Sequence, residues 1–121
     1  MALELSIVVP THNRSKALYA CLASLSRMNF PVNRFEIIVV DNASTDDTAG
    51  VVRHFKESWW GNVTYVYEGR PGPSHARNAG IARARGAIVG FIDDDVIVEP
   101  GWAEAIMRAF SADDIDRKSV V

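Results

Sequence analysis

The sequence has a single cysteine, no long apolar run and no marked excess of charge of either sign. Because Cys21 has no second cysteine to pair with, a disulfide-stabilised scaffold is excluded, and a single cysteine fits a reducing compartment. No stretch approaches the roughly 18 consecutive apolar residues that a membrane-spanning helix needs. With 13 basic and 15 acidic side chains, the net charge of −2 offers no basic surface for nucleic acid.

The first ten residues also lack a basic segment and a small-residue cleavage site, so a secretory signal peptide is not expected. We expect a cytoplasmic protein, either free or at the inner face of the membrane. The length of 121 residues is that of one ordinary domain, and contents of 48% apolar and 23% charged residues are average for a globular protein. The sequence therefore predicts one folding unit, residues 1–121, with a conventional hydrophobic core.

Four short apolar runs alternate with helical patterns along the chain. The runs at residues 35–40 and 87–92 are almost continuously apolar, which is typical of parallel strands covered by helices on both faces. The other two predicted strands are residues 5–9 and 63–67. The turn after the first strand contains no glycine, which argues against a dinucleotide-dependent dehydrogenase and against a P-loop nucleotide hydrolase.

Helical spacing of apolar residues separates the predicted strands. We expect the second helix to begin at Ser44 or Thr45 and the fourth to begin near Gly101. The third helix, residues 73–84, carries small residues on its apolar face, so it is expected to lie very close to the sheet. The order β-α-β-α-β-α-β-α predicts a three-layer α/β/α, Rossmann-like fold with a parallel sheet. The residues after Phe110 show no clear ending element, so we expect a truncated version of this fold.

Polar side chains gather just after the predicted strands and at the start of the third helix. In an open parallel sheet these positions share one edge, the carboxyl edge, where such folds bind ligands. We therefore expect a binding site at this edge. The candidate residues are Pro10, Thr11, Asn13, Asp41, Arg77, Asp93, Asp94 and Asp95.

Three consecutive carboxylates, Asp93, Asp94 and Asp95, directly follow the fourth predicted strand. This concentration of negative charge is costly unless a cation lies between the side chains. In an extended segment Asp93 and Asp95 point the same way, so they can share one ligand, and carboxylate oxygens suit Mg²⁺ or Mn²⁺. The alternative is a solvated acidic loop that caps the next helix.

Asp41 and Arg77 each have two interpretations. An acidic residue at the end of the second strand of a nucleotide-binding sheet accepts hydrogen bonds from a ribose or a base, whereas Asp41 followed by Asn42 also favours a simple turn. Arg77 stands among small residues, so its guanidinium would reach the carboxyl edge and meet a phosphate or a base carbonyl. Four further residues are assigned to structure, with Arg83 and Arg85 as solvated charges and Trp59 and Trp60 as packing residues.

Four segments of the sequence, taken together and in this order, carry a resemblance to a known family. They read Pro-Thr-His-Asn-Arg at residues 10–14, Val-Val-Asp-Asn-Ala-Ser-Thr-Asp at 39–46, Ala-Arg-Asn-Ala-Gly at 76–80 and Phe-Ile-Asp-Asp-Asp at 91–95, followed by Pro-Gly-Trp at 100–102. Over residues 5–110 the chain resembles the family 2 glycosyltransferases of the GT-A fold, a fold of nucleotide-diphospho-sugar transferases.

The resemblance implies transfer of a sugar from a nucleotide-diphospho-sugar to a hydroxyl of a glycan, a lipid or another acceptor, with inversion and with Mg²⁺ or Mn²⁺. By the same match, Thr11 and Asp41 would hold the base and the ribose, and Arg77 would contact the base or a phosphate. Asp93 and Asp95 would form the DXD motif, with Asp93 near the ribose and the metal shell and Asp95 as the direct metal ligand.

Catalytic domains of this family continue well beyond 121 residues into an acceptor-binding half that supplies the catalytic base. We therefore expect residues 1–121 to be the N-terminal, nucleotide-sugar-binding part, with the base outside the chain. One alternative is a non-catalytic nucleotide-binding fragment. A second is a receiver-like signalling module, which would need an aspartate at the end of the third strand, where Tyr67, Glu68 and Gly69 stand instead.

Overall fold

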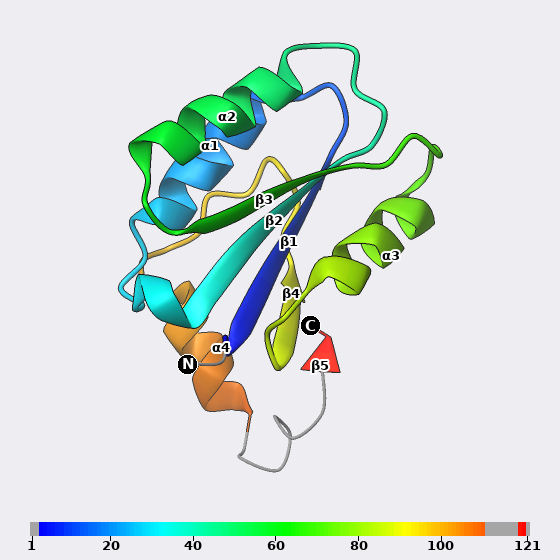
Figure 1. Ribbon diagram of the computed structural model, residues 1–121. Helices are drawn as coiled ribbons and strands as arrows, with labels where there is room; N and C mark the ends of the chain where they lie inside the picture. Colours follow the sequence, from blue (N-terminus) through cyan, green and yellow to red (C-terminus); the bar gives the residue numbers. More distant parts are fainter. Residues whose placement is uncertain (1–2, 111–118, 121) are drawn as a thin grey trace.

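The computed structural model describes residues 3–110 and 119–120. Its centre is a five-stranded sheet in the order β3-β2-β1-β4-β5, with every neighbouring pair of strands parallel (Figure 1). This arrangement confirms the predicted parallel α/β sheet. The strands are β1 (Leu5–Thr11), β2 (Phe35–Asp41), β3 (Asn62–Tyr67), β4 (Ile88–Phe91) and β5 (Ser119–Val120).

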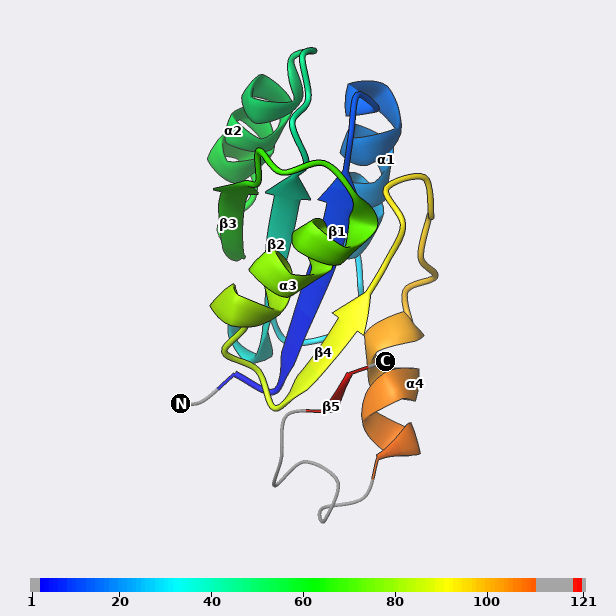
Figure 2. The ribbon, with the colours of Figure 1, turned by 90° about the vertical axis from the view of Figure 1, so that its right-hand side faces the viewer.

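Helices cover the sheet on both faces, as the near-continuous apolar strands require. α1 and α2 lie side by side on one face and α3 lies on the opposite face, which Figure 2 shows from the side of α3. The buried apolar side chains of α1, α2 and α4 share one hydrophobic cluster, and that of Ala76 in α3 belongs to a second. The helices are α1 (Ser15–Ser26), α2 (Thr48–Ser58), α3 (Pro73–Arg83) and α4 (Trp102–Ala109), with a 3-10 turn, η1, at Val32–Arg34.

α3 packs closely on β1, as its small residues predict. Ala76 and Gly80 are both buried against the sheet. A Cβ atom added at Gly80 would lie 2.4 Å from Cγ1 of Val8, which is closer than two carbon atoms approach in a packed core. The glycine therefore sets how near α3 comes to β1.

α2 begins later than expected, at Thr48 instead of Ser44 or Thr45. The hydroxyl of Ser44 accepts a hydrogen bond from the backbone N–H of Asn13 at 2.9 Å, so it does not cap the helix. Asp46 Oδ1 accepts the backbone N–H of Thr48 at 3.2 Å, and the Thr48 hydroxyl also donates to it. Residues 42–47 are consequently a loop.

The expectation of no element after Phe110 is also corrected. Residues Ser119–Val120 form β5, which pairs in parallel with Ile88 and Val89 of β4. A two-residue strand is too short to leave an apolar periodicity in the sequence.

A buried carboxylate lies at the amino edge of the sheet on the α3 face. The side chain of Glu36 is 1% exposed and accepts the hydroxyl of Ser6 at 2.6 Å and the backbone N–H of Arg85 at 2.7 Å. The Arg85 side chain is 63% exposed, as expected for a solvated charge, yet its guanidinium reaches the same carboxylate at 3.1 Å. These bonds supply the partners that a buried charge requires.

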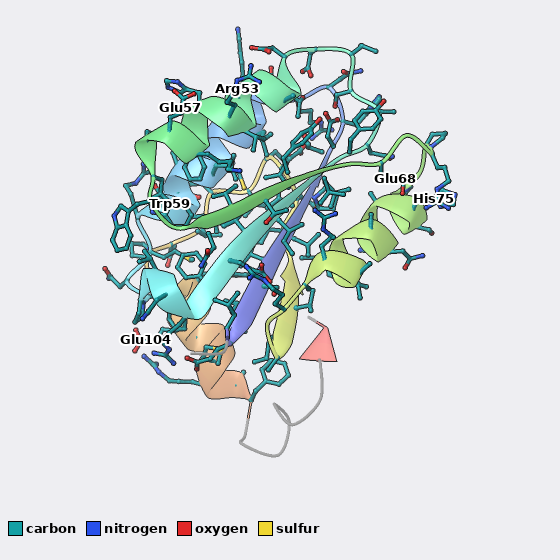
Figure 3. The ribbon with its side chains drawn as sticks, in the orientation of Figure 1. Arg53, Glu57, Trp59, Glu68, His75 and Glu104 are labelled. Atoms are coloured by element: carbon teal, nitrogen blue, oxygen red, sulfur yellow. The ribbon has the colours of Figure 1, made fainter. Side chains whose placement is uncertain are left out.

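The adjacent Trp59 and Trp60 differ in their packing. Trp59, which Figure 3 labels, packs as predicted, with its ring centroid 5.7 Å from that of Phe35 and 5.4 Å from that of Phe55. Trp60 is 84% exposed, so the packing prediction is wrong there. Within residues 3–110, none of the helices has the length and apolar character needed to cross a bilayer.

Candidate functional site

A cleft of about 620 Å³ lies at the carboxyl edge of the sheet. It is formed by the end of β1, the residue after β2, the first turn of α3 and the segment after β4, which come together because the strands are parallel. The position of the cleft agrees with the site expected from the sequence. Its lining residues are Pro10, Thr11, His12, Arg14, Asn42, Pro73, Ala76, Asp93, Asp94 and Asp95.

The three carboxylates form an acidic turn, Asp93–Asp95, which is not extended as the sequence suggested. β4 ends at Phe91, and the backbone N–H of Val96 donates to the carbonyl of Asp93 at 3.1 Å. The side chains still alternate, since Asp93 and Asp95 are exposed and Asp94 is buried. Two carboxylates of the acidic turn are therefore open to a ligand in the cleft.

Asp94 is hydrogen-bonded to the last residue of β1. Its Oδ2 accepts the hydroxyl of Thr11 at 2.9 Å, and both side chains are buried. The hydroxyl of Thr11, expected from the resemblance to hold the base or ribose, is thus engaged with the acidic turn.

Arg14 is the cation that faces the acidic turn. Its Nη1 lies 3.5 Å from Oδ1 of Asp94 and 3.5 Å from Oδ2 of Asp95. Both distances are long for a hydrogen bond. The side chains of Arg14 and Asp95 are 57% and 58% exposed, so this ion pair is in contact with water. Arg14 belongs to the segment at residues 10–14 that carries the family resemblance, and no role for it was expected from the sequence.

α1 supports the acidic turn from the other side. The thiol of Cys21 donates to the carbonyl of Asp93 at 3.8 Å, and the hydroxyl of Ser24 accepts the backbone N–H of Val98 at 3.1 Å. Burial, with the charges of Asp94 and Asp95 as further causes, raises the pKa of the Cys21 thiol to about 12. Cys21 is therefore a protonated core residue of α1.

Asn13 joins two loops and does not line the cleft. Its φ of 52° is in the left-handed region, which Asn tolerates better than most residues. Its Oδ1 accepts the backbone N–H of Thr45 at 2.7 Å and that of Asp46 at 3.2 Å. In return Asp46 Oδ2 accepts the backbone N–H of Ser15 at 3.2 Å, and hydrogen bonding, led by that from Thr48, lowers the pKa of Asp46.

Asp41 is buried beside the cleft and is not part of its lining. Its Oδ1 accepts the backbone N–H of Ser44 at 3.0 Å, which is the turn geometry of the structural interpretation. Its Oδ2 accepts the hydroxyl of Tyr65 at 2.6 Å. Burial, followed by the hydrogen bond and the charge of Asp41, raises the pKa of Tyr65. Each carboxylate oxygen keeps a further lone pair for another donor.

Asn42 connects the end of β2 to the loop before α3. Its Nδ2 donates to the carbonyls of Glu68 and Arg70 at 3.0 and 2.7 Å, and its Oδ1 accepts the N–H of Gly72 at 3.1 Å. The guanidinium and backbone N–H of Arg70 hold the pKa of Glu68 at about 2. Glu68 lies close to His75 in the first turn of α3 (Figure 3).

Arg77 is exposed and does not line the cleft. Its guanidinium lies over the ring of Phe91, 5.4 Å from the ring centroid. The structure therefore brings Pro10, Thr11 and the acidic turn together at the cleft, and it places Asn13, Asp41 and Arg77 outside the lining. The lining residues not singled out from the sequence are His12, Arg14, Asn42, Pro73 and Ala76.

Those missed residues all belong to the strand-end and helix-start segments that the sequence identified. Segment position was the available signal for them. The sequence carried no signal for the direction of each side chain within its segment. That direction depends on hydrogen bonds between loops about 30 residues apart, such as the bond that the N–H of Thr45 donates to Asn13.

The chemistry of the acidic turn fits a divalent cation. Asp93 and Asp95 offer exposed carboxylate oxygens on the cleft wall, while Asp94 is occupied by Thr11. In the part of the chain that the structure describes, no three His, Cys, Asp or Glu side chains converge as a preformed metal cage. Mg²⁺ commonly takes one or two carboxylates and completes its shell with water and substrate phosphates, so these residues suit an ion held in that manner.

Comparison with known proteins agrees with this architecture. A family model described as glycosyl transferase family 2 matches residues 6–116. Glycosyltransferase AglE of Haloferax volcanii is 29% identical over 111 residues, which cover 92% of this chain and 36% of the relative.

Two solved structures are also similar. A mannosyltransferase, PcManGT of Pyrobaculum calidifontis, in complex with GDP-Man and Mn²⁺, has a TM-score of 0.84 and 29% identity over 93% of this chain and 34% of its own. TarS of S. aureus in complex with UDP-GlcNAc has a TM-score of 0.74 and 30% identity over 88% of this chain and 30% of its own. The chain spans about a third of the length of AglE and of the two crystallised chains.

Proposed function

Because the chain belongs to glycosyl transferase family 2, we propose that its carboxyl-edge cleft binds the nucleotide diphosphate of a nucleotide-sugar donor. The bound donor would then pass its sugar to an acceptor hydroxyl of a glycan, a lipid or another compound, with inversion. The observation that carries the proposal is the meeting of β1, β2, α3 and the acidic turn at one cleft.

The donor class is supported by the similar structures. PcManGT was solved with GDP-Man and TarS with UDP-GlcNAc, and both share the fold of this chain. We assign the base and ribose to the neighbourhood of Thr11, Asp41 and Asn42, where the end of β2 borders the cleft. Pro10 and Asn13 shape the same wall, the latter by holding the two loops together.

The acidic turn would hold Mg²⁺ or Mn²⁺ through Asp93 and Asp95. When bound, such an ion supplies Lewis-acid stabilisation of the charge on the leaving nucleotide. Asp94 and Thr11 contribute by fixing the turn to β1, and α1 contributes through Ser24. Arg77 would serve the donor only after leaving its position over Phe91.

The acceptor site and the general base are proposed to lie outside these 121 residues. The support is the share of the relatives that the chain covers, 36% of AglE and 34% of PcManGT. Inverting transfer needs a base within hydrogen-bonding reach of the acceptor hydroxyl. We therefore propose that residues 1–121 are the donor-binding part of a longer catalytic unit.

Calorimetric titration with UDP, GDP and dTDP tests the proposal, each in Mn²⁺ and in excess EDTA. Since three carboxylates repel a diphosphate, at least one nucleotide should bind in Mn²⁺ and none should bind comparably in EDTA. The matching nucleosides, which lack phosphates, are the control and should show no response to the metal. Absence of binding in Mn²⁺ contradicts the nucleotide site, and equal affinity in EDTA contradicts the role of the metal.

A further inference from the structure

Arg14 is the only arginine or lysine among the described residues that line the cleft, and its guanidinium lies beside two carboxylates of the acidic turn, those of Asp94 and Asp95. Its backbone is fixed, because its carbonyl accepts the N–H of Leu18 at 2.9 Å in the first turn of α1. Its side chain is 57% exposed, so it can change direction without disturbing the core.

The two carboxylates beside Arg14 are not equivalent. Asp94 is 9% exposed and already has a close hydrogen bond from Thr11, so it does not depend on the guanidinium. Asp95 is 58% exposed, and Arg14 at 3.5 Å is its ion-pair partner. A divalent cation that binds Asp95 therefore meets a positive charge already in place.

We propose that Arg14 exchanges partners during donor binding: it neutralises Asp95 while the cleft holds no metal, and it turns to the donor diphosphate when a metal takes Asp95. The inference rests on the proposed function. The guanidinium suits the second partner, since its planar donors match phosphate oxygens.

This exchange would make metal and nucleotide binding depend on each other. Metal alone must displace the Arg14 guanidinium, and nucleotide alone meets the carboxylates of the acidic turn. When both arrive, the metal neutralises the carboxylates and Arg14 neutralises a phosphate, so each ligand raises the affinity for the other.

The test compares Arg14→Gln with Arg83→Gln. Arg14→Gln keeps much of the side-chain length and removes the charge. Arg83→Gln removes the same charge at the far end of α3, away from the cleft, and so controls for overall electrostatics. The first measurement is Mn²⁺ affinity without nucleotide, from the electron paramagnetic resonance signal of free Mn²⁺. The second is the affinity for UDP and GDP at saturating Mn²⁺, from calorimetry.

Arg14→Gln should bind Mn²⁺ alone about fivefold or more tightly than the unmodified chain, and should bind the nucleoside diphosphate about tenfold more weakly. Arg83→Gln should match the unmodified chain in both. Unchanged or weaker Mn²⁺ binding by Arg14→Gln overturns the exchange, and so does unchanged nucleotide affinity. If the unmodified chain itself binds no nucleotide in Mn²⁺, the proposed function fails, and the Mn²⁺ titration alone still decides whether Arg14 competes for Asp95.

Discussion

At the scale of single residues, the three adjacent carboxylates of the acidic turn differ in burial and in hydrogen bonding. Asp94 is buried and bonded to Thr11, whereas Asp93 and Asp95 face the cleft. The difference follows from the backbone turn after β4, which places one side chain against β1 and leaves two in contact with solvent. A ligand in the cleft therefore meets Asp93 and Asp95 first.

Replacing Asp95 by alanine should abolish metal-dependent nucleotide binding and leave the fold intact. The Asp95 side chain is 58% exposed and its ion pair with Arg14 is long, so the free energy of unfolding should change by about 0.5 kcal/mol or less. Calorimetry and thermal denaturation measure the two effects. Glu57→Ala on α2 removes an equal charge away from the cleft and should alter neither. A large fall in the melting temperature of apo Asp95→Ala would show that the residue is structural.

Asp41 to alanine should weaken nucleotide binding about tenfold to hundredfold, with or without metal. The reason is that a hydrogen bond to a buried charged group contributes about 1.5–3 kcal/mol. Tyr65→Phe is the matched control, because it removes the hydroxyl bonded to Asp41 and keeps the carboxylate. It should reduce stability and leave binding nearly unchanged. Normal binding by Asp41→Ala would leave Asp41 as a turn residue alone.

At the scale of secondary-structure elements, α1 is the platform on which the segment after β4 rests. Cys21 bonds to the carbonyl of Asp93, Ser24 bonds to the N–H of Val98, and the N–H of Asn29 donates to the carbonyl of Pro100 at 2.8 Å. α1 thus holds residues 93–98 at two points, and Asn29, in the segment just after the helix, adds a third at Pro100. A substitution that removes one of these hydrogen bonds should therefore alter the position of the acidic turn in the cleft.

Replacing Ser24 by alanine should lower stability by about 1–3 kcal/mol, the cost of leaving the buried N–H of Val98 without its partner. It should also weaken Mn²⁺-dependent nucleotide binding, since the segment that follows the acidic turn loses an anchor. Chemical denaturation and calorimetry give the two values. The control is Ser26→Ala, whose hydroxyl donates to the carbonyl of Ala23 within α1. Equal effects of the two variants on binding would contradict the anchoring role.

α3 offers a second test at this scale, because its distance from the sheet depends on Gly80. Gly80→Ala should destabilise by about 1–3 kcal/mol through overpacking, although alanine favours a helix over glycine. The new Cβ would meet the Val8 side chain. In urea denaturation the penalty should shrink when Val8 is also changed to alanine. The same penalty in both backgrounds would show that the close contact is not its cause.

At the scale of the whole molecule, the parallel sheet collects the groups of the cleft at one edge and carries a buried structural carboxylate at the opposite edge. The carboxyl edge carries the cleft and the acidic turn, whereas the amino edge carries the buried Glu36 with its bonds to Ser6 and Arg85. Both edges therefore carry carboxylates, but these differ in their access to solvent. The first is open to a ligand, and the second is satisfied within the protein.

The 121-residue chain alone should bind donor and transfer little or no sugar. The cleft is proposed to bind the donor, and the base and the acceptor surface are proposed to lie outside residues 1–121. Positioning of the two reactants accounts for several kcal/mol of a transfer barrier, so its loss is severe. The rate of transfer can be measured with labelled nucleotide-sugars, Mn²⁺ and a panel of glycan and lipid acceptors. Product formation at about 1 per second or faster, a rate typical of enzymes, would place the base within this chain.

The sequence by itself determined the order of strands and helices through β4 and α4, the three-layer class and the sheet edge at which the cleft lies. Those features depend on local patterns: apolar runs, helical spacing and polar residues at strand ends. The first strand, predicted at residues 5–9, extends in the structure to Thr11, and the third helix spans Pro73–Arg83 against a prediction of 73–84. Local pattern was sufficient because parallel strands bring all their carboxyl ends to one edge.

Tertiary structure alone decided which side chains face the cleft. Asn13 and Asp41 turn toward neighbouring loops because their oxygens accept N–H groups from residues 44–46, and Arg77 lies over Phe91. Arg14 faces the acidic turn across 80 residues of chain. Side-chain direction in a loop is set by whichever partner the fold brings within hydrogen-bonding distance, and that partner is distant in sequence.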